Sequence, residues 1–392
     1  MSGPALLARL EQSVAMRAEQ NLLRSARALQ VHDAVQVRRD GRLLTVFCSN
    51  DYLGLARHPA LVQALQQAAA AHGVGSTAAH LICGHQREHA MLEEALAAWT
   101  GRERALLFST GVMANAGVMQ ALLKRGDLCV QDRYNHASLL DGARLSGARL
   151  KRYPHRDSIA AARQLDTMPG AAALLATDGV FSMHGDLAPL LKLTAACDQR
   201  NALLMVDDAH GLGVNGPRGA GSVLAAGLDQ SRVPVLMGTL GKALGCFGAF
   251  VAGSSALIEG LTQFAHSYIY TTAPPPALAA AARVALGLAQ AADDRRQKLA
   301  QNIARFRSGA RQLGLALGSG EGPIQPLPAG DSGTALAAAR HLEIAGFLVT
   351  AIRPPTVPPG QARLRIALSA AHSADDIDQL LDALSTLPFS EP

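Results

Sequence analysis

Aromatic residues, cysteines and long apolar runs are all scarce in this sequence. Aromatic residues make up 4% of the 392 residues, and the five cysteines are widely spaced, with no Cys-x-x-Cys pair. The number and spacing of the cysteines argue against a disulfide framework or a zinc site, and they favour a reducing, cytoplasmic location. No apolar run approaches the roughly 18 residues of a membrane span. The chain also lacks the combined aromatic and basic pattern of nucleic-acid-binding proteins.

The remaining composition is typical of an ordered protein with more than one domain. Apolar residues account for 49% of the chain and charged residues for 17%. The length is sufficient for two or more domains with a large buried core. The formal net charge of +5 is modest. It is compatible with an anionic substrate, although ordinary solubility is the simpler explanation.

Short apolar runs alternate with alanine-rich helical patterns between residues 50 and 275, which we expect to form a large domain. Continuous apolar strands between helices predict an α/β fold with a mostly parallel sheet that is covered on both faces. The runs lie at residues 105–108, 128–130, 172–175, 203–206, 235–237 and 248–252.

The two flanking segments have different patterns. Residues 1–49 predict an amphipathic helix, with Leu6, Leu7, Leu10 and Val14 on one face, followed by short strands. A proline-rich stretch ends the large domain near residue 275. Residues 276–392 then predict a long bridging helix, to about residue 313, and a smaller α+β domain.

Several local patterns do not support the function that their letters suggest. The segment GVGSTA (73–78) resembles a dinucleotide fingerprint, but it follows a helical pattern instead of a strand. The segment GLGVNG (211–216) follows a strand, but the proline and glycines after it leave no room for a helix to start. Asp207 and His210 could ligate a metal, yet the sequence offers no convincing third and fourth ligand. We therefore expect no metal site.

Lys242 is the most distinctive residue of the chain. It lies in the segment GTLGKALG (238–245), directly after the apolar run 233–237. Most lysines are solvated surface residues, but a surface lysine gains nothing from a glycine-flanked turn at the end of a buried strand. An amine in this position suits a Schiff base, for which burial and cationic neighbours lower its pKa. We therefore predict a catalytic role for Lys242.

Two aspartates follow the apolar run 203–206. Asp207 and Asp208 lie at the strand edge where open α/β sheets bind ligands, and one of them should face the crevice. A turn or helix-cap role suits Asp208 better. His210, three residues further on, could reach the same ligand. A carboxylate near a Schiff-base lysine predicts pyridoxal phosphate (PLP), because it keeps the pyridine nitrogen protonated so that the ring can accept electrons.

A predicted helix start after the run 105–108 could bind the cofactor phosphate. The segment STGVMAN (109–115) forms a small polar turn and then a helix, whose free N–H groups and dipole attract anions. An ordinary capped helix has the same pattern. Thr239, three residues before Lys242, could add a hydroxyl group to the same phosphate.

Three further residues follow strands or lie in a stiff segment. His136, after the run 128–130, could stack on the pyridine ring or simply begin a helix. Ser182 lies beyond another strand end, near residue 177. Arg353 lies in AIRPPTVP (351–358), where neighbouring prolines restrict the backbone. A rigidly held guanidinium suits the binding of a substrate carboxylate, and this explains the position of Arg353 better than an ordinary surface role does.

Taken together, these motifs resemble the α-oxoamine synthases, PLP enzymes of fold type I with the aspartate aminotransferase fold. The resemblance covers nearly the whole chain, and the order of the motifs makes it highly specific. The matching segments are SNDYLGL (49–55), NHAS (135–138), DGVFSM (178–183), DDAHG (207–211) and TLGK (239–242). The implied fold has a large domain with a mostly parallel central sheet and a smaller C-terminal α+β domain.

The resemblance also implies roles for individual residues. Lys242 is the cofactor lysine and general base, and Asp207 pairs with the pyridine nitrogen. His210 and Ser182 bind near the ring hydroxyl, and His136 stacks on the ring and contacts the substrate. The phosphate is implied to contact the Gly111 and Val112 amides, Thr239 and, from the partner subunit of a homodimer, Thr271 and Thr272. The substrates are implied to contact Arg24, Asn50, Arg353 and Thr356.

Within the family, the arginine-proline-proline segment at 351–358 resembles the branch that joins L-alanine to a pimeloyl thioester with loss of CO₂, in biotin biosynthesis. The acyl carrier can be coenzyme A or acyl carrier protein. The alternative is a glycine C-acetyltransferase, which uses glycine and acetyl-CoA. A catalytically silent regulatory relative would need no intact Lys242 or Asp207.

Overall fold

The computed structural model describes residues 4–387 and falls into two units. One unit contains the described residues up to 49, residues 183–185 and those from 298 onward, and the other contains residues 50–182 and 186–297. This division differs from the predicted segments 1–49, 50–275 and 276–392 in three respects. The N-terminal segment groups with the C-terminal residues, and residues 183–185 group with them as well. The second boundary falls after residue 297, inside helix α12 (Asp293–Gln312).

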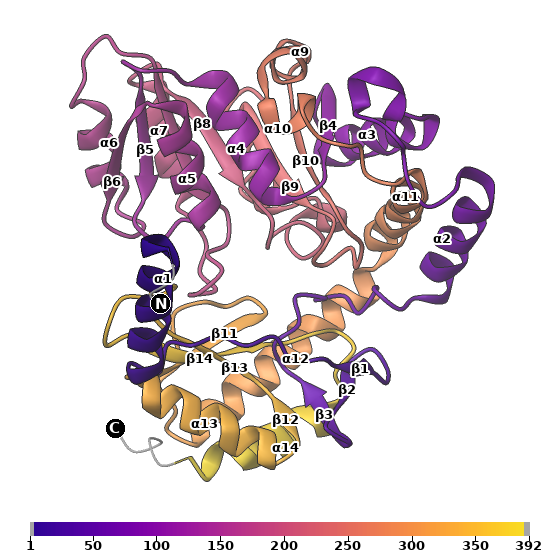
Figure 1. Cartoon of the computed structure of the whole chain (residues 1–392), viewed down its shortest axis with the longest axis vertical. Coiled ribbons are helices and arrows are strands. Elements are labelled where there is room, and N and C mark those ends of the chain that lie inside the picture. The colour runs from indigo at the N-terminus through magenta and orange to yellow at the C-terminus, as the bar shows by residue number, and fades with distance from the viewer. Residues whose placement is uncertain (1–3, 388–392) are drawn as a thin grey trace. The chain divides into compact units, whose positions relative to one another are not determined.

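The larger unit is built on a seven-stranded sheet with the order β4-β10-β9-β8-β7-β5-β6 (Figure 1). Strands β6, β5, β7, β8 and β9 pair in parallel, whereas β10 is antiparallel to both β9 and β4. The predicted mostly parallel sheet is therefore confirmed. The strands are β4 (Arg104–Phe108), β5 (Leu128–Asp132), β6 (Arg149–Tyr153), β7 (Ala173–Asp178), β8 (Leu203–Asp207), β9 (Val235–Thr239) and β10 (Ala249–Gly253).

Helices cover both faces of this sheet (Figure 1). One face packs against α4 (Gly111–Leu122), α5 (Ala137–Ser146), α9 (Ser255–Phe264) and α10 (His266–Ile269). The other packs against α6 (Ser158–Leu165), α7 (Leu190–Asp198) and α8 (Ser222–Ala225). Because both faces are buried, the central strands are apolar throughout and show no alternation, which is the pattern of the sequence.

The other helices of the larger unit include a layer in which α11 packs against α3 and, through small alanine side chains, against α2. Their bounds are α2 (Pro59–His72), a π-helical turn η1 (His80–Gly84), α3 (Arg87–Thr100), a 3₁₀ turn η2 (Pro217–Gly219) and α11 (Pro276–Ala291). The predicted single helix from 277 to about 313 is in fact two helices, because Ala292 leaves the helical conformation (φ −88°, ψ 42°) between α11 and α12.

The smaller unit combines two sheets with helices, as the sequence predicted for an α+β domain. The sheets have the orders β1-β2-β3-β12 and β11-β14-β13. The elements are α1 (Ala5–Glu19), β1 (Gln30–Val31), β2 (Gln36–Arg39), β3 (Arg42–Val46), β11 (Ile324–Gly330), α13 (Ser332–Ile344), β12 (Phe347–Leu348), β13 (Thr350–Ile352), β14 (Ala362–Ala367) and α14 (Ala374–Ser385).

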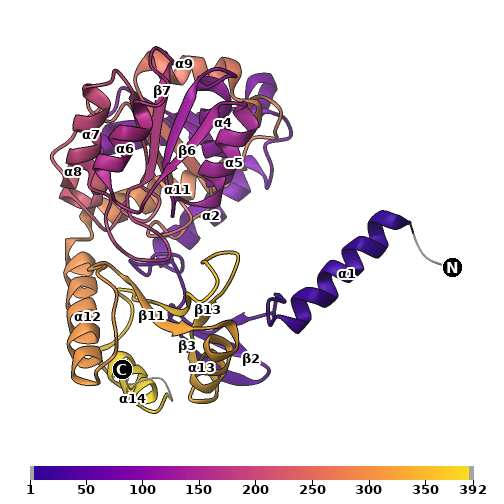
Figure 2. The same cartoon turned by 90° about the vertical axis from the view of Figure 1, so that its left-hand side faces the viewer.

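The N-terminal strands join this unit through long-range pairing. Strand β3 pairs in parallel with β12, and the Phe47 carbonyl accepts a 2.7 Å hydrogen bond from the N–H of Ala367. The Phe47 ring also stacks on His372, with ring centroids 4.1 Å apart. Helix α1 precedes these strands as predicted, and Figure 2 shows it extending away from them. Its four predicted apolar residues are exposed.

Candidate active site

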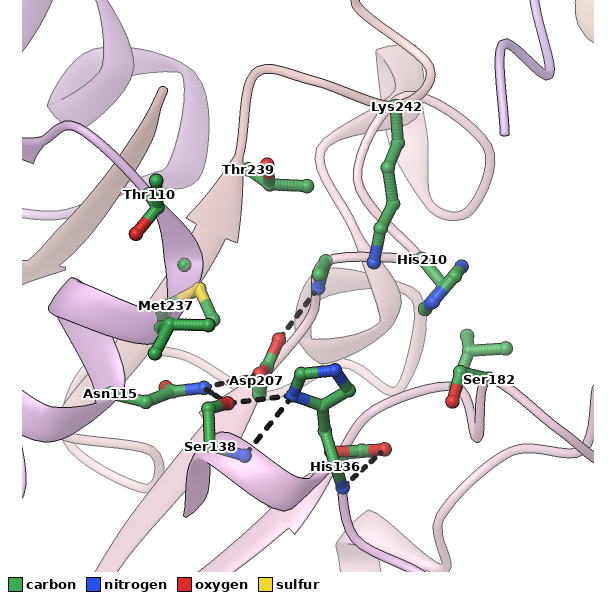
Figure 3. Close-up of a pocket in the computed structure, with 15 residues that line it drawn as sticks. Thr110, Asn115, His136, Ser138, Ser182, Asp207, His210, Met237, Thr239 and Lys242 are labelled. Atoms are coloured by element: carbon green, nitrogen blue, oxygen red, sulfur yellow. Dashed lines mark hydrogen bonds between the residues drawn. The ribbon is translucent and has the colours of Figure 1, made fainter. Parts of the chain in front are cut away.

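The carboxyl ends of five strands meet at one edge of the large sheet. Strands β5, β7, β8 and β9 are parallel, and β4 shares their direction because both β4 and β9 are antiparallel to β10. A cavity of about 190 Å³ lies at this edge (Figure 3). Eight of the predicted site residues line it, namely Gly111, Val112, His136, Ser182, Asp207, His210, Thr239 and Lys242.

Lys242 enters the cavity from a tight turn between β9 and β10. The turn is closed by hydrogen bonds from the N–H of Gly245 to the Lys242 carbonyl and from the N–H of Cys246 to the Leu240 carbonyl, both 2.8 Å long. Gly245 has φ +66°, and a Cβ atom there would lie 2.4 Å from the main-chain nitrogen of Ala56. Only glycine fits this position. The glycines of the lysine segment thus fix the direction from which the half-buried Lys242 side chain enters.

Asp207 and Asp208 lie in different surroundings. Asp207 lines the cavity, and its Oδ1 atom accepts the N–H of Ala209 at 3.1 Å. Asp208 faces the protein interior, where its Oδ2 atom accepts the N–H of Ser222 at the start of α8. Burial raises the pKa of Asp208 to about 7, against the opposing hydrogen bonds from Ser222. Asp208 is therefore a structural residue beside the site.

His136 is held from its main chain and from its ring. Its N–H lies 3.2 Å from both carboxylate oxygens of Asp178, at the end of β7. Its Nδ1 atom lies 2.7 Å from Ser138 Oγ. The Nδ1 edge of the ring is covered by Ser138. The rest of the ring faces the cavity, and His136 is therefore an exposed residue. Partial desolvation lowers the pKa of His136, and this outweighs the attraction of the Asp207 carboxylate.

His210 is oriented by residues from the segment at 49–55. Its Nδ1 atom lies 2.7 Å from the Tyr52 hydroxyl, and this hydroxyl lies 3.1 Å from Asn50 Oδ1. Tyr52 is fully buried. Asn50, a predicted substrate residue, thus contacts the site through Tyr52 and does not line the cavity itself.

The N-terminus of α4 forms another wall of the cavity. Thr110 caps the helix, because its hydroxyl oxygen accepts the N–H of Met113 at 3.2 Å. The N–H groups of Gly111 and Val112, in the first turn, have no acceptor within the helix and remain available for an anion. Thr239 lies nearby, and its hydroxyl donates to the Gly248 carbonyl at 3.0 Å.

Five predicted site residues lie elsewhere. Thr271 and Thr272 belong to the larger unit but do not line the cavity, and Thr272 pairs with Ala79 in an isolated β-bridge. Arg24, Arg353 and Thr356 belong to the smaller unit, where they line a second cavity of about 600 Å³.

Within that second cavity, Arg353 donates hydrogen bonds to the main-chain carbonyls of Asn21 and Leu23, the latter at 3.1 Å. Arg24 donates to the Thr356 hydroxyl at 3.2 Å. The two arginines therefore connect the segment after α1 to the turn after β13.

The sequence did not single out several residues that support the site. Asn115 and Ser138 line the cavity and bond to predicted residues, Asp178 anchors His136, and Tyr52 orients His210. Asn115 and Ser138 lie within helices, whereas Asp178 ends strand β7 and Tyr52 lies in a turn. For Asn115, the available signal is a polar residue in an otherwise apolar helix, GVMANAGVMQAL. For Asp178, it is a carboxylate at a strand end, as for Asp207.

A histidine between two carboxylates lies beside the Ser182 segment. His155 Nδ1 is 3.1 Å from Asp132 Oδ1, and its Nε2 atom is 2.9 Å from Asp186 Oδ2. The Asp186 carbonyl in turn accepts the N–H of Phe181, next to Ser182. Burial by itself lowers the pKa of His155, but hydrogen bonds to the two carboxylates outweigh it and raise the pKa to about 9. His155 is therefore an imidazolium at neutral pH.

This arrangement predicts a stability change at alkaline pH. Because the pKa of His155 in the folded chain, about 9, lies above the ordinary value of 6.5, its stabilisation is complete below pH 6.5 and is lost as the pH rises through 9. We expect the free energy of unfolding to fall by roughly 2–3 kcal/mol more in the wild type than in His155→Gln over this range. Denaturant titrations at several pH values measure this. The exposed His32→Gln variant is the control, and parallel curves for wild type and His155→Gln would refute the ion pairs.

Comparison with known proteins places this chain in a family. The model of aminotransferase class I and II matches residues 43–384. An 8-amino-7-oxononanoate synthase from Halorhodospira halophila is 55% identical over 398 aligned positions, which cover 100% of this chain and 98% of the relative. The chain belongs to the 8-amino-7-oxononanoate synthases of the class I and II aminotransferase family. The predicted family, fold type and PLP-dependent acyltransferase class are confirmed, and the alternative glycine C-acetyltransferase is not supported.

Solved structures of relatives agree with this membership. A serine palmitoyltransferase from S. paucimobilis, solved with PLP and myriocin bound, is 27% identical with a TM-score of 0.93 over 98% of both chains. An 8-amino-7-oxononanoate synthase from Francisella tularensis is 32% identical with a TM-score of 0.77, over 87% of this chain and 97% of that one. PLP is the cofactor of the family.

The residues of the cavity fit this cofactor. A primary amine (Lys242), a carboxylate that is 5% exposed (Asp207) and a helix N-terminus with available N–H groups (Gly111) line one space. These three groups match the aldehyde, the pyridine nitrogen and the phosphate of PLP in chemical type. Among residues 4–387, no cluster of three or more potential ligands could hold a metal ion, and no helix is long and apolar enough to cross a membrane.

Proposed function

We propose that this chain condenses L-alanine with a pimeloyl thioester to give 8-amino-7-oxononanoate, CO₂ and a free thiol, a step of biotin biosynthesis. The observation that carries the proposal is the meeting of Lys242, Asp207 and His136 in one cavity of a chain that is 55% identical to a named 8-amino-7-oxononanoate synthase. We further propose that the chain acts in the cytoplasm as a homodimer.

The bound cofactor supplies an electron sink that stabilises negative charge on the alanine Cα atom. Around it, Asp207 would keep the pyridine nitrogen protonated, and His136 would cover the ring. His210 and Ser182 would contact the ring hydroxyl. The phosphate would be held by the N–H groups of Gly111 and Val112 and by Thr239. Thr271 and Thr272 of the partner subunit would contact it as well.

Lys242 moves the protons of the reaction in this proposal. Its amine removes the Cα proton of alanine, and the Cα atom then forms a bond to the thioester carbonyl carbon while the C–S bond breaks and the thiol leaves. The bond between Cα and the alanine carboxylate breaks next and releases CO₂. Lys242 returns this proton to Cα, and the departing thiolate takes up one proton from solvent to give the free thiol, so that atoms and charge balance over the cycle. Lys242 enters from the turn after β9, on the side of the cavity that His210 also occupies (Figure 3).

The smaller unit would supply groups for the substrates. Arg353 presents a planar guanidinium that suits a carboxylate, and Arg24 and Thr356 lie in the same cavity. Because Arg353 already donates to the carbonyls of Asn21 and Leu23, a bound carboxylate would have to share or replace these bonds. We propose that Asn50 contributes through Tyr52, whose hydroxyl it contacts.

The proposed substrates can be tested by offering the holoenzyme each pairing of amino acid and thioester. We expect thiol release with L-alanine and pimeloyl-CoA to exceed that with glycine and acetyl-CoA by at least about tenfold, because several methylene contacts of the acyl chain are lost with acetyl. Thiol release is followed with a chromogenic disulfide, and the product mass identifies the amino acid used.

Two comparisons sharpen this test. Mixed pairings, L-alanine with acetyl-CoA and glycine with pimeloyl-CoA, show which substrate the site selects. Pimeloyl-CoA and pimeloyl-acyl carrier protein, compared at equal concentration, identify the preferred carrier. Preference for glycine and acetyl-CoA would overturn the proposal in favour of the sister reaction.

A further inference from the structure

A chain of hydrogen bonds in the cavity wall connects Asp207 to His136 through two residues without an assigned role. The Asn115 Nδ2 atom lies 2.8 Å from Asp207 Oδ2 and 2.8 Å from Ser138 Oγ. Ser138 Oγ lies 2.7 Å from His136 Nδ1. Asn115, Ser138 and Asp207 are all buried. Figure 3 shows the four side chains grouped on one side of the cavity.

Asp207 sets the direction of these hydrogen bonds. An ionised carboxylate only accepts, so the Asn115 side chain must turn its NH₂ group toward Asp207. The second hydrogen of this group then points to Ser138 Oγ, which accepts it. The Ser138 hydroxyl is left to donate its own hydrogen to His136 Nδ1.

The main chain of Ser138 gives independent support for the same direction. Its N–H lies 3.3 Å from His136 Nδ1, and an N–H group can only donate. A ring nitrogen that accepts a hydrogen bond carries no proton. The neutral ring of His136 must therefore carry its proton on Nε2.

The amide oxygen of Asn115 shows what this orientation costs. Within residues 4–387, Asn115 Oδ1 is buried and has no hydrogen-bond partner. An unpaired buried acceptor is unfavourable, but turning the amide over would place Oδ1 against the Asp207 carboxylate instead. The observed orientation is the one that Asp207 requires.

We propose that Asn115 and Ser138 are positioning residues, which fix the Asp207 carboxylate and hold His136 as a neutral imidazole with its proton on Nε2. This inference deepens the proposed function and rests on it, because its value lies in the reaction at Lys242. A neutral ring with an Nε2 proton offers a hydrogen-bond donor to the open side of the cavity, where negative charge develops on substrate oxygens.

The positioning chain also solves an electrostatic conflict. The Asp207 carboxylate favours a charged imidazolium at His136, which would compete with the pyridine nitrogen for that carboxylate. Two donors at Nδ1, the hydroxyl and the N–H of Ser138, keep a second proton off the ring. Desolvation and the nearby Lys242 amine lower the pKa of His136 in the same direction.

The tautomer can be observed directly by NMR of the holoenzyme with ¹⁵N-labelled histidine. Protonated and unprotonated ring nitrogens differ widely in chemical shift, and His136→Gln identifies the signal by its loss. We expect the wild type to show a protonated Nε2 and an unprotonated Nδ1 near neutral pH. In Ser138→Ala, the share of charged or Nδ1-protonated ring should rise, and the midpoint of the His136 titration should move to higher pH.

Kinetics provide a second readout. Ser138→Ala should lower kcat about tenfold with the KM for alanine changed less than about twofold, because one hydrogen bond at the reacting end is lost. Asn115→Leu should lower kcat further, because it releases Asp207 as well. Ser138→Thr, which keeps the hydroxyl, should restore both the tautomer and most of kcat.

Ser146→Ala is the matched control. Ser146 lies at the other end of the same helix, α5, where its hydroxyl donates to the Ala143 carbonyl at 2.8 Å, and it does not line the cavity. Its activity and His136 signal should equal those of the wild type. A wild-type ring protonated on Nδ1, or an unchanged His136 signal in Ser138→Ala, overturns the inference. Because the NMR signal needs no turnover, a wild type that releases no thiol with alanine and pimeloyl-CoA refutes the proposed function separately.

Discussion

Lys242→Ala is expected to lower turnover by about 10⁴-fold or more, because the variant loses both the covalent attachment of the cofactor and the base that moves the Cα proton. Among residues 4–387, no other lysine lines the cavity, so no neighbouring amine can replace it. The turn around Lys242 is closed by main-chain hydrogen bonds, which the substitution leaves in place. Thiol release with alanine and pimeloyl-CoA measures the loss.

Lys192→Ala controls for the removal of one lysine, since Lys192 is exposed on α7 and does not line the cavity. It should retain wild-type turnover. Circular dichroism of Lys242→Ala should match that of the wild type, which separates a loss of chemistry from a loss of fold. Turnover of Lys242→Ala within tenfold of the wild type would remove Lys242 from the reaction.

The central sheet and its functional edge could be predicted because their signals are local. The apolar runs identify strands that are buried on both faces, and the polar residues directly after them must meet where parallel strands end. Lys242, Asp207 and His136 were found in this way, from three separate strand ends. The same reasoning assigned Asp208 to a structural turn, because neighbouring residues at a strand end point in different directions.

Strand β6 (Arg149–Tyr153) was not predicted because it lies at the edge of the sheet. Its sequence, RLKRY, is mostly basic, and charged residues are common on edge strands, where they prevent further pairing. The membership of the N-terminal segment in the smaller unit was also hidden. It depends on pairing between β3 and β12, about three hundred residues apart, and no local pattern reports a contact of that range.

The supporting residues of the site were missed for the same physical reason. Tyr52 and His210 are 158 residues apart in sequence, and Asn115 and Asp207 are 92 apart. Such hydrogen bonds form only when separate elements pack together. The sequence therefore predicts which residues reach the cavity more readily than which residues orient them.

Asp207→Asn is expected to lower kcat by about 10²–10³-fold with a much smaller effect on cofactor binding. The amide is nearly the same size as the carboxylate, but it carries no charge with which to hold a proton on the pyridine nitrogen. Lys242 still attaches the cofactor in this variant. Equilibrium dialysis with PLP, together with thiol release, separates binding from turnover.

Asp208→Asn is the matched control, since it makes the same chemical change at the adjacent buried residue. The pKa of Asp208 is already raised to about 7 by burial, so an uncharged side chain resembles its protonated form, and the main-chain hydrogen bond from Ser222 can be kept through the amide oxygen. Its kcat should stay within a few-fold of the wild type. If both variants lose turnover equally, the loss reflects damage to the end of β8, and if neither does, Asp207 has no part in activating the cofactor.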